Sequence, residues 1–430
     1  MTSDVSMLRA AVACTDDRGA WRRRYHEVRA QSLSLSAPLS AEDQQVQSMA
    51  DVSPTKWHLA HITWFFETFL LSPRLKGYRP YDEAFGFLFN SYYEAVGERH
   101  PRPQRGLLSR PSLALVHGYR AHVDEAMDRL IAGATGEDWP RVLPLLELGL
   151  HHEQQHQELI LMDIKHVFSL NPLAPAYRPP LPRQGLEAPK LEWLDFDGGL
   201  MEIGHDGDGF AFDNESPRHK VWLEPFRLAS RLATCGEYLA FIEDGGYARA
   251  ELWLSDGWAA VQAQGWDAPL YWTRDADGGR RVFTLAGLQP LDPAEPVCHL
   301  SHYEADAFAR WSGARLPTEA EWETAAGSAT LDGNLADRGL YHPTSAEGPG
   351  LRQMIGDVWE WTMSPYVAYP RYRPPEGAVG EYNGKFMSGQ MVLRGGAAVT
   401  PAGHVRTSYR NFFPPAARWA FSGVRLADDA

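Results

Sequence analysis

The sequence predicts an α+β protein, in which an N-terminal four-helix bundle precedes a second domain of short strands and long loops. Residues 1–170 carry apolar side chains at helical spacing. Residues 171–190 contain six prolines, which exclude a helix or a central strand there. After this segment, short apolar runs alternate with Gly, Asp and Pro. We therefore predict a bundle domain over 1–170, a proline-rich linker over 171–190 and a second domain over 191–430.

Two helices are expected in the first half of the bundle. Trp21, Tyr25 and Val28 recur at the spacing of one helix face. The second helix lies in SPTKWHLAHITWFFETFLL, which begins at residue 53. Its start is marked by Ser53 as the N-cap and Pro54 at the first helical position.

Two more helices complete the predicted bundle. The segment from Pro111 to Ala132 is expected to be helical, because it carries an apolar stripe formed by Val116, Tyr119, Val123, Met127 and Leu130. A fourth helix is expected from Trp139 through LELGLHHEQQHQELILMDIKHVF. The interior of such a bundle can hold a metal ion.

The second domain is predicted to contain two clear helices. One lies in SHYEADAFARWSG (301–313), and the other runs from Pro317 through EAEWETAAG. The remainder is expected to form short strands and long loops, because Gly and Pro are frequent. The 15 Trp, 17 Tyr and 18 Phe residues indicate that large rings hold these loops in place.

Composition limits the functional classes. The net charge of −14 argues against a nucleic-acid partner, because phosphate binding requires a basic face. No run approaches the length of a membrane span, and the N-terminal stretch lacks the basic and apolar regions of a signal peptide. Only three cysteines occur, Cys14, Cys235 and Cys298, and they are far apart. We therefore expect a soluble, cytoplasmic protein.

The fourth helix carries the strongest chemical motif. His152 and His156 are four residues apart, so both imidazoles can reach one ion from the same helix face. The string HEQQH also matches the H-E-x-x-H pattern, in which Glu153 would be the general base of a zinc hydrolase. The extended metzincin pattern is missing, because Leu159 and Met162 occupy its Gly and His positions.

A second histidine pair lies on the second helix. His58 and His61 are three residues apart, and either could supply a third nitrogen from a facing helix. Three neutral imidazoles suit a redox iron as well as a catalytic zinc, and spacing alone does not choose between them. The alternative is a set of buried, hydrogen-bonded histidines at a helix interface.

Two further clusters are candidates for substrate contacts. The first contains Tyr92 and Tyr93, with Arg102 and Arg105 downstream. It is either a solvated loop or a lid that offers a proton donor and a carboxylate clamp. Near the C-terminus, Phe412 and Phe413 precede two prolines and are expected on a rigid loop. Such rings either fill a core or form an aromatic face for a quaternary ammonium ion.

Several motifs carry a resemblance to known families. The N-terminal part resembles a DinB-like bundle. The second part resembles the formylglycine-generating-enzyme, or sulfatase-modifying factor, domain with its C-type-lectin-like fold, through DNESPRHKV, ARLPTEAEWETAAG, GDVWEWT, LRGG and FSGVRLA. Both parts together, with HLAH and HEQQHQE, resemble the EgtB family of hercynine sulfoxide synthases in ergothioneine biosynthesis.

The resemblance implies a non-haem Fe(II) centre bound by His61, His152 and His156, with His58 in a supporting role. It implies that Gln155 and Asn411 contact hercynine, that Phe412 and Phe413 face its trimethylammonium group, and that Tyr92 or Tyr93 donates a proton. Arg102 and Arg105 would hold the carboxylate of the sulfur donor.

The implied reaction uses O₂ to join a sulfur donor to the imidazole C2 of hercynine, leaving a sulfoxide. The C-terminal loop reads Asn411-Phe412-Phe413 where the mycobacterial form has Asn-Trp-Asp, and the tyrosine pair resembles the branch that takes free cysteine. Selenoneine synthase (SenA), which uses a selenosugar, shares both domains and is the alternative. A zinc hydrolase and a non-catalytic lectin-like binding module are the alternatives from other classes.

Overall fold

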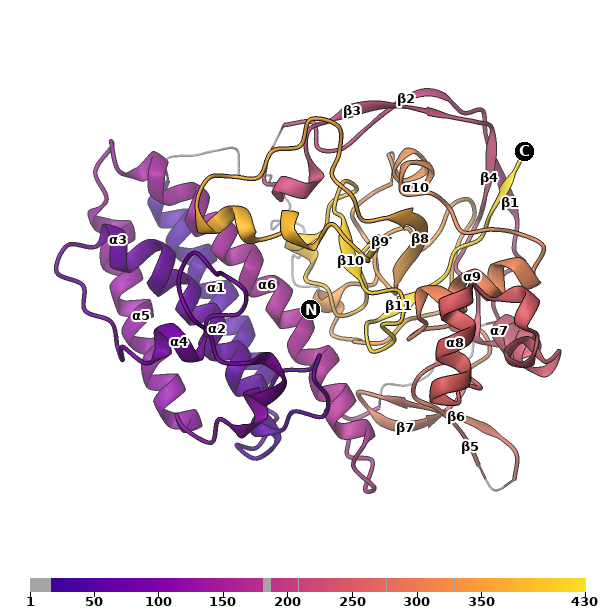
Figure 1. Ribbon diagram of the computed structural model, residues 1–430, viewed down its shortest axis with the longest axis horizontal. Helices are drawn as coiled ribbons and strands as arrows, with labels where there is room; N and C mark the ends of the chain where they lie inside the picture. The colour runs from indigo at the N-terminus through magenta and orange to yellow at the C-terminus, as the bar shows by residue number, and fades with distance from the viewer. Residues whose placement is uncertain (1–16, 181–186, 208, 276, 328) are drawn as a thin grey trace, which may run out of the picture.

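The computed structural model describes residues 17–180, 187–207, 209–275, 277–327 and 329–430 (Figure 1). Cys14, the N-terminal stretch examined for a signal peptide and residues 181–186 of the predicted linker lie outside the described residues. Helices of the N-terminal part gather on one side of the molecule and the strands on the other, as the α+β prediction requires (Figure 1).

The N-terminal part contains the four long helices that the sequence predicts. They are α1 (Arg18–Ser36), α2 (Thr55–Phe66), α5 (Leu113–Gly133) and α6 (Trp139–Ser169). A π-helical segment, Glu67–Leu71, continues α2 into the short α3 (Ser72–Arg74), and α4 (Phe85–Leu88) lies in the following loop. The helix α2 packs against both α5 and α6, and α6 runs along the boundary with the strands (Figure 1).

The start of α2 differs from the prediction by one residue. Pro54 is the N-cap and Thr55 the first helical residue, so Ser53 is not the cap. The Ser53 hydroxyl instead accepts a hydrogen bond from Arg105 Nη1 at 3.0 Å, while its backbone N–H donates to Asp163 at 2.8 Å. The hydroxyl and the backbone N–H of Ser53, which could cap the helix locally, are therefore bonded to residues distant in the sequence. In α5, Ser112 does act as the N-cap, because its Oγ accepts from the N–H of Leu115.

Within the described residues, the strands of the second part form four small sheets. The largest has the order β10-β9-β8-β11, from Asn411–Phe413, Met391–Arg394, Trp359–Pro365 and Ser422–Gly423. The others are β1-β4-β12 (Trp193–Phe196, Phe226–Ala229, Ala427–Asp429), β2-β3 (Gly199–Ile203, His219–Leu223) and β5-β6-β7 (Trp272–Arg274, Arg280–Thr284, Gly287–Pro290). The prediction of a rigid loop at Phe412 and Phe413 is wrong, because both pair with β9 in an antiparallel ladder.

Four helices accompany these sheets. The two that the sequence predicts are present as α9 (His302–Trp311) and α10 (Glu319–Ala326), each with a Ser or Thr capping box. The other two, α7 (Cys235–Glu243) and α8 (Ser255–Gln264), are not among the predicted helices. α7 begins with a Thr234–Glu237 capping box, a signal that could have revealed it, whereas α8 has no side-chain cap.

The two parts share a buried interface along α6. Glu158 on α6 accepts hydrogen bonds from Trp359 Nε1 at 2.7 Å and from Thr400 Oγ1 at 2.5 Å. Lys165, two turns further along the helix, contacts His299 Nε2 at 2.6 Å. Because α6 carries the HEQQH motif, this interface places the second part beside the histidines.

Candidate metal centre

The structure brings together the three histidines that the sequence nominates as metal ligands. His61 lies on α2, and His152 and His156 lie one turn apart on α6. All three are buried, and each offers a ligand atom within 4.8 Å of the other two. Nitrogens bound to one ion at about 2 Å lie closer than this, so small side-chain rotations would complete the geometry.

The hydrogen bonds of these rings leave nitrogen lone pairs unused. His61 Nδ1 lies 2.6 Å from the carbonyl oxygen of Phe89, so Nδ1–H donates and Nε2 keeps its lone pair. Within the described residues, neither His61 Nε2 nor either nitrogen of His152 has a hydrogen-bond partner, although all are buried. Buried polar atoms usually have partners, so nitrogens of His61 and His152 without one are free to bind a ligand. The residues therefore fit a bound metal ion.

Electrostatics keep the three rings in the form that binds metals. Burial lowers the pKa of His152 to about 3. Burial, reinforced by the neighbouring histidines, also places the pKa values of His61 and His156 well below the ordinary range. Neutral imidazoles have a free lone pair, so protonation does not compete with a metal near pH 7.

Glu153 is held away from the role of a general base. Its carboxylate accepts hydrogen bonds from Arg29 Nη1 at 3.0 Å, Arg120 Nη2 at 3.2 Å and Ser32 Oγ at 2.7 Å. Burial acts to raise the pKa of Glu153, but the two arginines more than offset it, so the pKa is lowered. The arrangement disfavours the zinc-hydrolase alternative, since a carboxylate that is ion-paired and already accepts from three donors is a poor general base.

Aromatic rings surround the histidines. Trp57 stacks on His61 with 4.6 Å between ring centroids, and Phe65 lies 4.7 Å from His152. Tyr93 lies 5.6 Å from Trp64, which itself stacks on His61 at 5.5 Å. The centre is thus enclosed by rings that limit access of water.

The predicted tyrosine pair lies beside this enclosure. Tyr92 and Tyr93 stack at 4.6 Å, and their hydroxyls are 3.5 Å apart. Burial raises the pKa of both phenols, so both remain protonated across the neutral range. A protonated phenol can donate a hydrogen bond or a proton to a bound group.

Tyr382 is a residue of the centre that the sequence analysis did not nominate. It belongs to the segment Ala378–Phe386, and its ring lies 5.7 Å from His152 and 6.4 Å from Tyr92. Its hydroxyl donates to Gln155 Oε1, and Gln155 Nε2 donates to Tyr409 Oη at 2.8 Å. The long loop around Tyr382 has no periodic pattern, so only the fold brings this ring to the histidines.

The rings of the phenylalanine pair contact other aromatic side chains. Phe412 stacks on Tyr366 at 4.0 Å and on Phe386 at 5.9 Å, while Phe413 contacts Trp419. Across the described part of the chain, no ring contact joins Phe412 or Phe413 to His61, His152 or His156. Phe412 connects to the centre through Phe386, which lies 5.2 Å from Tyr92. Asn411 begins the same strand, and its Oδ1 accepts from the N–H of Phe412.

The two predicted arginines have different surroundings. Arg105 is buried, its guanidinium lies 3.3 Å from the centroid of Trp57, and it donates to Ser53 Oγ and Ser91 Oγ. Arg102 is exposed and donates to the carbonyl oxygen of Asp51. Arg105 thus reaches the ring that stacks on His61, whereas Arg102 lies at the surface.

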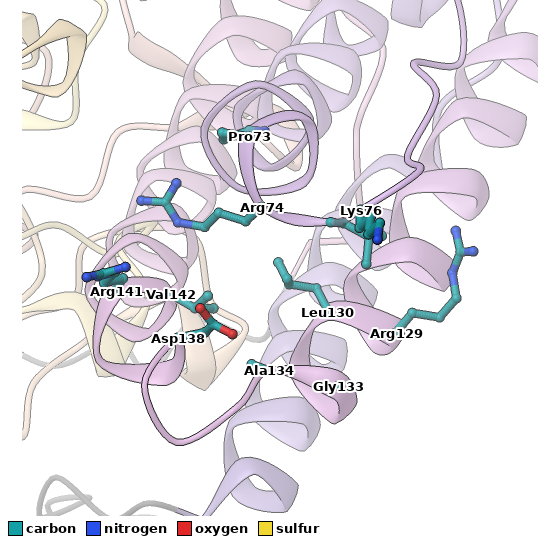
Figure 2. Close-up of a pocket in the computed structure, with 11 residues that line it drawn as sticks. Pro73, Arg74, Lys76, Arg129, Leu130, Gly133, Ala134, Asp138, Arg141 and Val142 are labelled. Atoms are coloured by element: carbon teal, nitrogen blue, oxygen red, sulfur yellow. The ribbon is translucent and has the colours of Figure 1, made fainter.

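A cavity of about 560 Å³ lies elsewhere in the bundle (Figure 2). It is formed by α3, the end of α5 and the start of α6, and its lining includes Arg74, Lys76, Arg129, Asp138 and Arg141 (Figure 2). None of the three histidines lines it. Its last lining residue on α6, Val142, precedes His152 by roughly 15 Å of helix. This cavity is therefore separate from the histidine centre.

Among the described helices, none is long and apolar enough to cross a membrane.

Comparison with known proteins agrees with both halves of the architecture. Residues 24–160 match the DinB superfamily, and residues 188–347 and 339–430 match the sulfatase-modifying factor enzyme 1-like domain. The hercynine oxygenase of Mycolicibacterium thermoresistibile is 33% identical over 96% of this chain and 95% of its own length. That of Mycobacterium tuberculosis is 34% identical over 88% of this chain and 91% of its own.

The second part alone is similar to a different enzyme. The formylglycine-generating enzyme of Streptomyces coelicolor is 28% identical over 54% of this chain and 88% of its own length. The hercynine oxygenases named above match across both the bundle and the sheet-rich part. The chain is an enzyme that belongs to the hercynine oxygenase family, with a DinB bundle joined to a sulfatase-modifying-factor domain.

Proposed function

We propose that this protein is a non-haem iron(II), O₂-dependent sulfoxide synthase that joins cysteine to the imidazole C2 of hercynine in ergothioneine biosynthesis. The observation that carries the proposal is the convergence of three buried, neutral histidines within 4.8 Å, in a chain of this family. Iron(II) bound there would supply the redox chemistry that O₂ requires. One O₂ accepts four electrons from the C–H and S–H bonds and the sulfur atom, giving the sulfoxide and one water.

The side chains of this centre divide the remaining work. His61, His152 and His156 would hold the iron and leave positions for substrates, so that proximity lowers the barrier. Tyr92 and Tyr93 keep their protons, because burial raises the pKa of both phenols, and either hydroxyl can donate to an oxygen or sulfur atom at the centre. The surrounding rings keep water out.

We assign hercynine recognition to the side of the centre that faces the second part of the chain. Gln155 lies one residue from His156, between Tyr382 and Tyr409, where its amide can meet an imidazole or a carboxylate. Asn411 and the rings of Tyr382, Phe386 and Phe412 offer a polar group and aromatic faces. A trimethylammonium ion has no hydrogen-bond donor and is attracted by such faces. Phe413 would support this surface through Trp419.

We assign the sulfur donor to the side of the centre where Arg105 packs against Trp57. Arg105 is buried against Trp57 and has a guanidinium that pairs well with a carboxylate, and Arg102 lies nearby in the same 3₁₀ segment. We place the reaction in the cytoplasm, where a reducing environment keeps cysteine and iron(II) available.

A donor-competition assay tests the proposal. Iron-loaded protein is incubated with hercynine and O₂, together with cysteine, γ-glutamylcysteine or a selenosugar, and products are identified by mass spectrometry. We expect the cysteine sulfoxide conjugate as the main product. A carbon–selenium product from the selenosugar alone would instead identify a selenoneine synthase. Zinc-dependent peptide cleavage without O₂ consumption would overturn the assignment as a whole.

A further inference from the structure

A fourth buried histidine, His58, stands behind the three of the candidate metal centre. His58 Nδ1 lies 2.8 Å from Nδ1 of His156, and His58 Nε2 lies 2.9 Å from Asp163 Oδ2. The same carboxylate oxygen accepts the backbone N–H of Ser53 at 2.8 Å. His58 is 2% exposed, and Asp163 is 3% exposed. A continuous hydrogen-bonded chain therefore leads from the start of α2 through Asp163 and His58 to a metal ligand.

The chemistry of these groups fixes where the protons lie. A carboxylate can only accept, so His58 must carry its proton on Nε2. The Nδ1 of a neutral His58 is then an acceptor, so the proton between the two rings belongs to His156 Nδ1. His156 is left with a lone pair on Nε2 alone, which is the atom available to a metal.

We propose that His58 and Asp163 are positioning residues, which hold His156 in the tautomer that presents Nε2 to the metal. This inference rests on the metal centre of the proposed function. The residue His61 reaches the same state through a different acceptor, because its Nδ1–H donates to the carbonyl of Phe89. Acceptors on the far side of metal-bound histidines commonly set the tautomer and ring orientation, and losing one costs about 10–100-fold in metal affinity.

The arrangement also explains why two side chains, His58 and Asp163, are needed to orient His156. Asp163 lies seven residues after His156 on α6, so it is two turns away along the same helix. His58, on the facing helix α2, spans the gap between them. The backbone N–H of Ser53, just before α2, then holds the carboxylate in place. The orientation of the ligand thus depends on the packing of α2 against α6.

Two isosteric pairs of variants test the proposal. In His58→Gln, the amide can still accept from His156 and donate to Asp163, whereas His58→Met has a similar size and no such groups. Likewise, Asp163→Asn can still accept from His58 and Ser53, whereas Asp163→Leu cannot. The metal-free proteins are titrated with Co²⁺ by visible absorption, and the melting temperature of each metal-free variant is recorded by circular dichroism.

We expect His58→Met and Asp163→Leu to weaken Co²⁺ binding by about 10–100-fold. His58→Gln and Asp163→Asn should remain within about threefold of the wild type. Nitrogen-15 spectra of histidine-labelled, metal-free protein should assign the His156 proton to Nδ1 in the wild type and in His58→Gln, and lose that assignment in His58→Met.

The outcomes separate this proposal from the function it rests on. If the wild type binds Co²⁺ and each pair weakens binding equally, or not at all, the two residues are only structural and the proposal is overturned. If the wild type fails to bind Co²⁺, the proposed metal centre itself is overturned. Should one apolar variant fail to fold, the Co²⁺ affinities of the other pair decide the result.

Discussion

At the scale of single residues, the charged and polar side chains of the HEQQH helix have separate tasks. His152 and His156 face the metal centre, while Glu153, between them in sequence, is neutralised by Arg29 and Arg120. The Glu153 carboxylate accepts from Arg29, Arg120 and Ser32, so the literal H-E-x-x-H string does not by itself make its glutamate a general base. The role of each residue of α6 thus depends on the partners it meets: His61 of α2 for the two histidines, and Arg29 of α1 and Arg120 of α5 for Glu153.

The first prediction concerns Glu153. Glu153→Gln removes the charge that neutralises two buried guanidinium groups, so we expect a loss of about 3–5 kcal/mol in the free energy of unfolding, measured in urea. Co²⁺ affinity should change by less than about threefold. The control is Glu147→Gln, whose partner Arg24 is partly exposed and whose loss should cost about 1 kcal/mol or less. Unchanged stability with abolished catalysis would restore Glu153 as a general base.

The second prediction concerns His61. Saturating Co²⁺ should raise the melting temperature of the wild type, because an ion that binds only the folded state stabilises it. In His61→Ala this rise should disappear, since two histidines on one helix leave the ion without its third nitrogen. His122→Ala, a substitution on α5 outside the cluster, should keep the full rise. A rise in His61→Ala equal to that of the wild type would show that His61 is not a ligand.

At the scale of elements, the long helices were predictable and the loop that completes the centre was not. The four bundle helices are each twelve or more residues long, which is enough to reveal their period. The segment Ala378–Phe386 has no such period, yet it brings Tyr382 to His152. It stays there because the Glu381 carboxylate accepts the backbone N–H groups of Glu94 and Ala95 at 3.0 and 2.8 Å.

The third prediction follows from this contact between elements. Glu381→Ala removes the acceptor for two adjacent backbone N–H groups and the partner of Lys385, so the loop after Tyr93 should open more often. We expect at least tenfold faster amide hydrogen exchange at Glu94 and Ala95, with little change in the bundle helices. Glu376→Ala, an exposed substitution in the same loop, is the control. Equal exchange in both variants would mean that the contact does not restrain the tyrosine loop.

At the scale of the whole molecule, α6 is shared by both parts of the chain. Its His151 contacts His404 at 3.0 Å, its Glu158 binds Trp359 and Thr400, and its Lys165 lies between Tyr271 and Phe421. The candidate metal centre therefore lies where the bundle and the sheet-rich part meet, since Tyr382 of the second part lies beside His152 of the bundle. Folding and assembly of the centre should be coupled.

The fourth prediction measures this interface through Lys165. Burial lowers the pKa of Lys165 to about 8, whereas the unfolded chain holds the proton up to its ordinary pKa of 10.5. The unfolded state binds more protons in this window, so stability should rise with pH, by about 2 kcal/mol between pH 8 and 9.5. Urea unfolding should show this rise in the wild type and in the exposed control Lys190→Met, but not in Lys165→Met. If the free energy of unfolding of all three proteins changes equally with pH, the Lys165 ammonium is in contact with water.

The sequence by itself determined the α+β class, the four long helices and the His152–His156 pair, because helical period and residue spacing are local properties of the chain. The choice of His61 over His58 as the third ligand came from the resemblance to a known family. The sequence did not predict that Tyr382 lies beside His152 or that Glu153 pairs with two arginines. It also did not predict that Phe412 and Phe413 belong to a strand. These outcomes depend on contacts between residues that are tens to hundreds of positions apart. Such contacts form only when α2, α6 and the second part pack together, so the tertiary structure alone decided them.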